Sequence, residues 1–262
     1  MSELKVSAFT SEAGHWYTRK GEPMYQIEGA NGKIRNTTLR DARKHDLVPS
    51  VTTILGVAAK PGLEKWKMQQ VLFAALTLPK RDGESETQYL DRILDDSREQ
   101  AKAAADVGTQ IHAAIQQYYE EDVRYPVEYV QYVSGVDSQI ERFFGKHDWE
   151  CETAFAHELG YGGKADMLTR SSDDPSVGIL LDVKTKEFYD PEKVEAYDEH
   201  LMQLAAYRMG LGVPNARCAN VFVSRGIPGM VKIIEWSPED LDRGWEMFRS
   251  LLTFWQLKNN HK

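Results

Sequence analysis

The second half of the chain alternates short apolar runs with longer segments of helical periodicity, an order that few architectures can accommodate. Apolar and β-branched runs bounded by turn residues predict strands over 150–158, 162–170, 178–185, 217–224 and 229–236. Apolar residues spaced three and four apart predict helices over 127–145, 191–210 and 238–258. This order of helices and strands is typical of a mixed sheet flanked by helices. The predicted fold class is therefore α/β.

The first half of the chain is predicted to be mainly helical. Apolar residues at helical spacing predict helices over 62–78 and 86–121, with a break or bend at Gly108. Ser50 stands where it can cap a short helix, and a small hairpin is predicted over 15–28. We expect one integrated unit made of an N-terminal hairpin with a polar extension, a helical lobe and an α/β core, at 1–48, 49–147 and 148–262.

Composition argues against several classes of protein. Two cysteines, Cys151 and Cys218, are too few for a disulfide framework or a cysteine-only metal cluster. No apolar run approaches the ~20 residues that a membrane-spanning helix needs. The N-terminus lacks a signal-peptide core, and Glu3 and Glu12 argue against a transit peptide, so we expect a cytoplasmic compartment. The net charge of −8 is unlike that of a protein that simply coats nucleic acid, but it suits a site that collects carboxylates.

Two carboxylates and a lysine are predicted to meet in the hairpin formed by the strands over 162–170 and 178–185. Antiparallel pairing places Asp166 roughly opposite Asp182 or Val183, and Asp182 shares a strand face with Lys184. Facing carboxylates repel, so we expect a cation between them, and oxygen ligands favour Mg²⁺ or Mn²⁺. A lysine there can orient or deprotonate an attacking water and offset charge on a phosphate. The alternative is that this tripeptide merely ends a buried strand in polar residues.

Other polar and aromatic side chains have a functional and a structural interpretation. Gln203 and Tyr207 are one turn apart on a predicted helix and share a face. His112 lies on a predicted helix among alanines. Each of these alone is more typical of packing than of a site. The same holds for three aromatic residues that could stack on bases, namely Trp66, Tyr118 and Tyr119.

The order of these motifs along the chain resembles that of a known enzyme family. The successive motifs of PD-(D/E)XK nucleases of the RecB type are similar to Gly108-Thr-Gln-Ile-His112, Gly163-Lys-Ala-Asp166, Asp182-Val-Lys184 and Gln203-Leu-Ala-Ala-Tyr207. Three further segments resemble signatures of one group within this family, which contains the mitochondrial genome maintenance exonuclease and its phage and bacterial relatives. These segments are Pro49-Ser-Val-Thr-Thr-Ile-Leu55, Leu63-Glu-Lys-Trp-Lys67 and Glu152-Thr-Ala-Phe-Ala-His-Glu158. The resemblance covers about residues 47–210 and implies a restriction-endonuclease-like core with an N-terminal helical lobe.

The resemblance implies a role for each motif residue. A metal would be bound by His112, Asp166 and Asp182, with help from the Val183 carbonyl, and Lys184 would be the catalytic lysine.

Further residues would assist the site or contact DNA. The site or the DNA backbone would be supported by Gln203 and Tyr207. A second metal could be reached by Glu152 or Glu158, although either can be a plain strand residue. Contacts to phosphate are implied for Ser50, Thr52, Thr53, Thr185 and Lys186; a helix cap explains the first three equally well, and a surface lysine the last.

The implied function is a metal-dependent DNA exonuclease acting on single strands or DNA ends in recombination, repair or replication-end processing. The cofactor would be Mg²⁺ or Mn²⁺, and a histidine ligand leans toward Mn²⁺. An iron–sulfur cluster is not expected, because members that carry one use four cysteines. DNA is the expected partner, together with a recombinase or single-strand-binding protein, and no membrane. Two alternatives stay open: a structure-specific or restriction-type endonuclease, and a non-catalytic DNA-binding module on the same fold.

Overall fold

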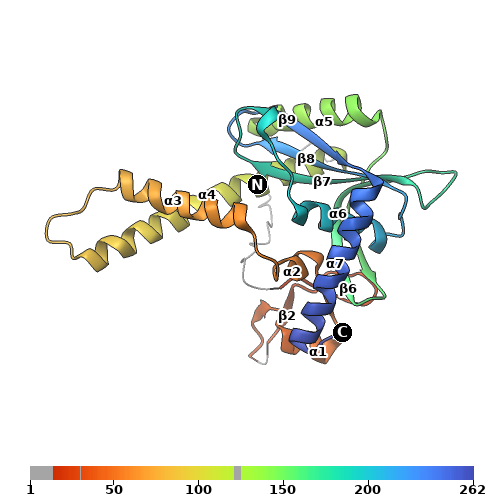
Figure 1. Ribbon diagram of the computed structural model, residues 1–262, viewed down its shortest axis with the longest axis horizontal. Helices are drawn as coiled ribbons and strands as arrows, with labels where there is room; N and C mark the ends of the chain where they lie inside the picture. The colour runs from red at the N-terminus through yellow and green to blue at the C-terminus, as the bar shows by residue number, and fades with distance from the viewer. Residues whose placement is uncertain (1–13, 30, 121–124) are drawn as a thin grey trace.

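The computed structural model describes residues 14–29, 31–120 and 125–262, and its core is a five-stranded mixed sheet in the order β5-β6-β7-β8-β9 (Figure 1). Neighbouring strands are antiparallel except β7 and β8, which are parallel and connected through a helix. The strand bounds are Glu150–His157, Tyr161–Arg170, Gly178–Lys186, Arg217–Ser224 and Val231–Trp236. The predicted α/β class and restriction-endonuclease-like core are confirmed.

The two faces of the sheet are covered by different helices. On one face, Leu181 and Val183 of β7 pack with Ile111 of α4 (Glu86–Tyr119) and Val136 of α5 (Val130–Phe144). On the other face, alternate strand residues pack against α6 (Asp198–Gly210) and α7 (Pro238–Asn259). Side chains alternate along a strand, so β7 is apolar on both faces because both are covered. The predicted helix over 191–210 is shorter than expected, because a 3₁₀ turn at Pro191–Lys193 precedes α6.

The predicted hairpin over 15–28 forms as a tight turn, in which the Thr18 N–H donates to the Glu22 carbonyl at 2.9 Å and the Met24 N–H donates to the Trp16 carbonyl at 2.8 Å, but the strands on either side of the turn pair elsewhere. Strand β1 (Trp16–Tyr17) pairs with β4 (Val48–Pro49), and β2 (Gln26–Glu28) pairs with β3 (Ile34–Asn36). In this part of the described chain, an antiparallel bridge between Tyr17 and Pro23 closes the turn. The predicted polar extension also contains a helix, α1 (Leu39–His45), which a Thr38–Asp41 capping box begins.

Helices α3 (Pro61–Thr77) and α4 form a hairpin that projects from the body of the protein (Figure 1). Arg92 Nη2 lies 2.8 Å from Glu84 Oε2, and the Tyr89 hydroxyl donates to the Leu78 carbonyl at 2.8 Å. Ser85 caps α4 with Gln88 as its capping-box partner. These polar contacts fix the turn where little apolar surface is buried.

The ion pair at this turn predicts a pH-dependent stability. Arg92, assisted by the Arg81 backbone N–H, lowers the pKa of Glu84 from 4.5 to about 2. A carboxyl with a depressed pKa stabilises the fold above its ordinary pKa, and this contribution is lost as the pH falls toward the folded value. We expect Glu84→Gln to lower the free energy of unfolding at pH 7. The difference in this free energy between wild type and the variant should narrow below pH 4.5. Urea unfolding at several pH values measures this, with Glu99→Gln on α4 as the control; a gap unchanged at pH 3 would contradict it.

The prediction that residues 1–12 lack a targeting sequence lies outside the described residues, as do parts of the predicted segment 1–48 and the last residue of the predicted helix over 86–121. In the described part of the chain, no helix combines the length and the hydropathy needed to cross a bilayer.

Candidate metal centre and active site

The centre of the candidate site is the point where β6 and β7 separate. Their ladder runs from Arg170 and Gly178 to Met167 and Leu181 and ends there. Beyond it, the Asp166 carboxylate accepts a hydrogen bond of 2.7 Å from the Val183 N–H. The side chain of Asp166 thus takes the place of a ladder partner.

Helix α4, which covers the sheet face formed by Leu181 and Val183, brings His112 to this point. His112 Nε2 lies 3.1 Å from Asp166 Oδ2. The predicted break at Gly108 is wrong, because α4 runs without interruption from Glu86 to Tyr119. Gly108 is buried where the helix crosses β7, and a Cβ atom at this position would lie 2.4 Å from Thr185 Oγ1. This close approach explains the glycine. It also sets the distance of α4 from β7, and therefore the position of His112, which lies one turn further along the helix.

Strand β5 contributes Glu152 to the same cluster. The pairs on either side, Cys151 with Met167 and Thr153 with Ala165, place Glu152 across from Asp166. Glu152 has a φ of 52°, a left-handed conformation that costs a non-glycine residue about 1–3 kcal/mol and is concentrated at functional sites.

The donor atoms of His112, Glu152 and Asp166 all lie within 4.8 Å of one another. One imidazole nitrogen and two carboxylates are a suitable ligand set for a divalent cation such as Mn²⁺ or Mg²⁺. These three side chains could therefore hold a metal ion. Glu158, the other acidic candidate, is exposed beyond the end of β5 and is not part of the cluster.

Asp182 lies beside the cluster but contacts other partners. Its side chain is 1% exposed; Oδ1 is 2.8 Å from Lys184 Nζ, and Oδ2 accepts a 2.8 Å hydrogen bond from Asn220 Nδ2. Oδ1 of the Asn220 side chain accepts a 2.8 Å hydrogen bond from Trp236 Nε1. Both oxygens of Asp182 are thus engaged, and its predicted role as a metal ligand stays a prediction.

Asn220 and Trp236 were missed at the sequence level. Asn220 carries a weak signal, since it is a polar residue in an otherwise apolar strand. Its pairing with Asp182 depends on the parallel register of β7 and β8, which local patterns do not reveal. Lys164 was also missed as a site residue, although it lies inside a motif; it forms an ion pair with Glu152.

The charges of the ionisable groups at this site are strongly linked. Burial raises the pKa of Asp182, whereas Asp166, which burial alone would also raise, has a lowered pKa because of His112 and Lys184. Asp166 in turn raises the pKa of His112. Burial alone would lower the pKa of Lys184, but Asp182 and Asp166 outweigh it and raise the pKa. Lys184 is therefore protonated at neutral pH and suited to offset negative charge rather than to accept a proton.

Gln203 and Tyr207 contact each other on the face of α6 that covers this site. The Gln203 amide nitrogen lies 3.0 Å from the Tyr207 hydroxyl, and both side chains are buried. Burial, followed by Asp182 and Asp166, raises the pKa of Tyr207 well above its ordinary value. The Tyr207 hydroxyl is therefore a neutral group close to the carboxylates of Asp182 and Asp166.

The three hydroxyl residues predicted to contact phosphate lie at the start of α2 (Val51–Leu55), where Ser50 is the N-cap and Thr52 and Thr53 belong to the first turn. Ser50 Oγ accepts from the Thr53 N–H at 3.0 Å, and its oxygen lies 3.0 Å from Thr52 Oγ1. Thr53 Oγ1 accepts from the His15 N–H at 3.2 Å. Capping explains these side chains, and their contact with phosphate stays a prediction.

The remaining candidates occupy different surroundings. Thr185 lies under Gly108, and Lys186 Nζ is 5.2 Å from the centroid of the Tyr197 ring. Their contacts with DNA also stay predictions. Two of the predicted stacking residues donate to one carboxylate, that of Asp137, at 3.0 and 3.1 Å, and pack beside α5: Tyr118 and Tyr119.

The chain matches no protein family, and no curated protein matches it in sequence. Among solved structures, a "Putative exonuclease" from Eubacterium rectale is 14% identical, with a TM-score of 0.39 over 60% of this chain and 69% of that chain. The protein SSO0001 is 16% identical, with a TM-score of 0.29 over 72% of this chain and 86% of that chain. Because these sequence identities and TM-scores are low, the function is inferred from the site itself.

Proposed function

We propose that the protein is a divalent-metal-dependent nuclease that hydrolyses phosphodiester bonds in DNA, acting as an exonuclease on single strands or DNA ends. The observation that carries this proposal is the cluster of His112, Glu152 and Asp166 beside the ion pair of the buried Asp182 with the half-buried Lys184. Motifs far apart in the sequence supply these side chains. They come together where two central strands separate, at a sheet edge covered by α4 and α6.

Each side chain has a chemical task in this reaction. A bound Mg²⁺ or Mn²⁺ ion would supply Lewis acidity toward the phosphoryl oxygens. His112, Glu152 and Asp166 would hold the ion, and Lys184 would stabilise the negative charge that develops on the phosphate. Water attacks phosphorus and loses a proton to solvent, the P–O3′ bond breaks, and the leaving O3′ takes up a proton, so that the products carry a 5′-phosphate and a 3′-hydroxyl. Asp182, held by Asn220, positions the ammonium group of Lys184.

The proposal is tested with end-labelled linear single-stranded DNA in Mg²⁺, Mn²⁺ or EDTA. We expect wild type to release label in either metal and not in EDTA, and Asp182→Ala, which leaves Lys184 without its partner, to be inactive. The sizes of the released products would assign the polarity. Absence of cleavage in both metals would contradict the proposal, and DNA binding without cleavage would favour a non-catalytic module.

A covalently closed single-stranded circle separates exonuclease from endonuclease activity. A strict exonuclease needs an end, so we expect the circle to survive under conditions that degrade the linear strand. Cleavage of the circle would instead show that the enzyme is an endonuclease.

A further inference from the structure

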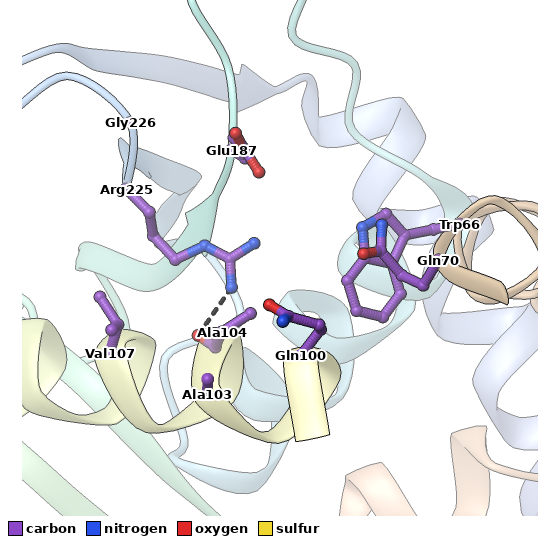
Figure 2. A pocket seen from close by; sticks show the side chains of 9 residues that line it. All are labelled: Trp66, Gln70, Gln100, Ala103, Ala104, Val107, Glu187, Arg225 and Gly226. Atoms are coloured by element: carbon purple, nitrogen blue, oxygen red, sulfur yellow. Dashed lines mark hydrogen bonds between the residues drawn. The ribbon is translucent and has the colours of Figure 1, made fainter. Parts of the chain in front are cut away.

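A second candidate site lies at the base of the α3–α4 hairpin. A cavity of about 350 Å³ opens between this hairpin and the segments that follow β7 and β8 (Figure 2). Its polar and aromatic lining comes from α3, α4 and these two segments, through Trp66, Gln70, Gln100, Glu187 and Arg225. Its volume is within the range of about 300–1,000 Å³ that is usual for small-molecule pockets.

The pocket offers one aromatic face and several hydrogen-bonding groups. Trp66 and Gln70 are one turn apart on α3, so both point into the cavity, and Gln100 faces them from α4 (Figure 2). Trp66 is only half-buried, which leaves part of its indole available to a ligand. Each carboxamide carries both a donor and an acceptor.

Arg225 is held in place at the opposite wall. Its Nη1 donates to the Ala104 carbonyl at 2.7 Å, and its own carbonyl accepts from the Tyr132 hydroxyl at 3.2 Å. Glu187 contributes one carboxylate to the same wall and accepts from the Tyr189 hydroxyl at 2.6 Å. One cation and one anion leave no excess charge in the lining to attract a phosphate. The lining instead suits a neutral, flat ligand with donors and acceptors along its edge, which describes a nucleobase.

The pocket lies close to the metal-binding cluster. Val107, which lines it, precedes Gly108 at the crossing of α4 over Thr185. Ala104, also in the lining, is about 12 Å from His112 along the helix. A base in the pocket and a phosphodiester at the cluster can therefore belong to the same strand.

We propose that this pocket is a nucleobase-binding subsite, in which a base of the single strand undergoing cleavage stacks on Trp66 while the amides of Gln70 and Gln100 bind its edge. The inference rests on the proposed nuclease function. Stacking on an aromatic ring tolerates any base, and a carboxamide offers both a donor and an acceptor, so the subsite can accept different bases.

Equilibrium binding of a labelled single-stranded oligonucleotide in EDTA tests the subsite without cleavage. We expect Trp66→Ala to raise Kd about tenfold, since stacking on one aromatic side chain has an effect of this order. Trp66→Phe should retain most of the affinity, and Gln70→Ala should weaken binding. Gln69→Ala is the matched control, because Gln69 is its exposed neighbour outside the pocket, and its Kd should equal that of wild type.

An abasic oligonucleotide of the same length separates stacking from a structural role. If Trp66 contacts a base, Trp66→Ala loses affinity for the normal strand and none for the abasic strand. Equal losses on both strands, or an unchanged Kd on the normal strand, overturn the subsite. Metal-dependent cleavage by wild type in that case leaves the nuclease proposal standing. A wild type that does not bind single-stranded DNA in EDTA and does not cleave it in Mg²⁺ or Mn²⁺ overturns both.

Discussion

Lys184→Ala is expected to lower the rate of DNA cleavage by about 10²- to 10³-fold while divalent metal binding is retained, because the lost ammonium is a charge-stabilising group and not a ligand. Single-turnover cleavage with excess enzyme measures the rate, and titration calorimetry with Mn²⁺ measures binding. Asp166→Asn is the contrasting variant. Asp166 lies within the ligand cluster, so this variant should lose both metal binding and cleavage.

The fold of the lysine variant needs its own control. Removing Lys184 leaves the buried Asp182 without its ion-pair partner, and the loss of that partner destabilises the fold. Lys184→Gln is a milder second variant, since its amide can still donate to the carboxylate. Circular dichroism establishes that both remain folded at the assay temperature. Turnover at the wild-type rate by either folded variant would remove Lys184 from the mechanism.

Gly108→Ala is expected to reduce cleavage by about 10²-fold, even though alanine favours a helix interior over glycine by about 1 kcal/mol. The new methyl group would lie 2.4 Å from Thr185 Oγ1, so α4 must move away from β7 or Thr185 must reorient. A shift of the helix moves His112 away from Asp166, and misplacement of a site residue by about 1 Å costs activity on this scale. The rate is measured as for the lysine variants.

Thr185 provides the internal test of this explanation. The double variant Gly108→Ala, Thr185→Ala removes the obstructing oxygen, so it should recover much of the rate relative to Thr185→Ala alone. Gly62→Ala is the control within a helix, because a Cβ there meets its nearest atom at an ordinary 3.4 Å. A wild-type rate for Gly108→Ala would show that the contact with Thr185 does not hold His112 in place.

The parts of the fold that depend on local patterns were predicted well. Five strands and the helices around them follow from alternation and helical spacing, which each segment carries in itself. The strand pairing of the N-terminal segment was not predicted, because Trp16 and Tyr17 pair with residues more than thirty positions away. A pattern of apolar residues does not specify such a distant partner.

The candidate site shows the same division. The convergence of Asp166, Asp182 and Lys184 could be predicted, because it depends on one hairpin and on strand alternation. The engagement of Asp182 by Asn220 could not, since it needs the register across the parallel pair of β7 and β8. Glu152 was one of two acidic candidates in the sequence, and only its left-handed backbone and strand pairing distinguish it from Glu158.

The unbroken α4 helix also has a mechanical consequence. It touches β7 most closely at Gly108, and a rigid rod that rocks about this point is a lever with unequal arms. The arm toward the hairpin turn is about 33 Å long, and the arm to His112 about 6 Å. A swing of about 2 Å at the turn therefore displaces the imidazole by less than about 0.5 Å, below the displacement of about 1 Å that costs activity. The outer end of the hairpin can therefore move by this amount while the imidazole stays within reach of Asp166.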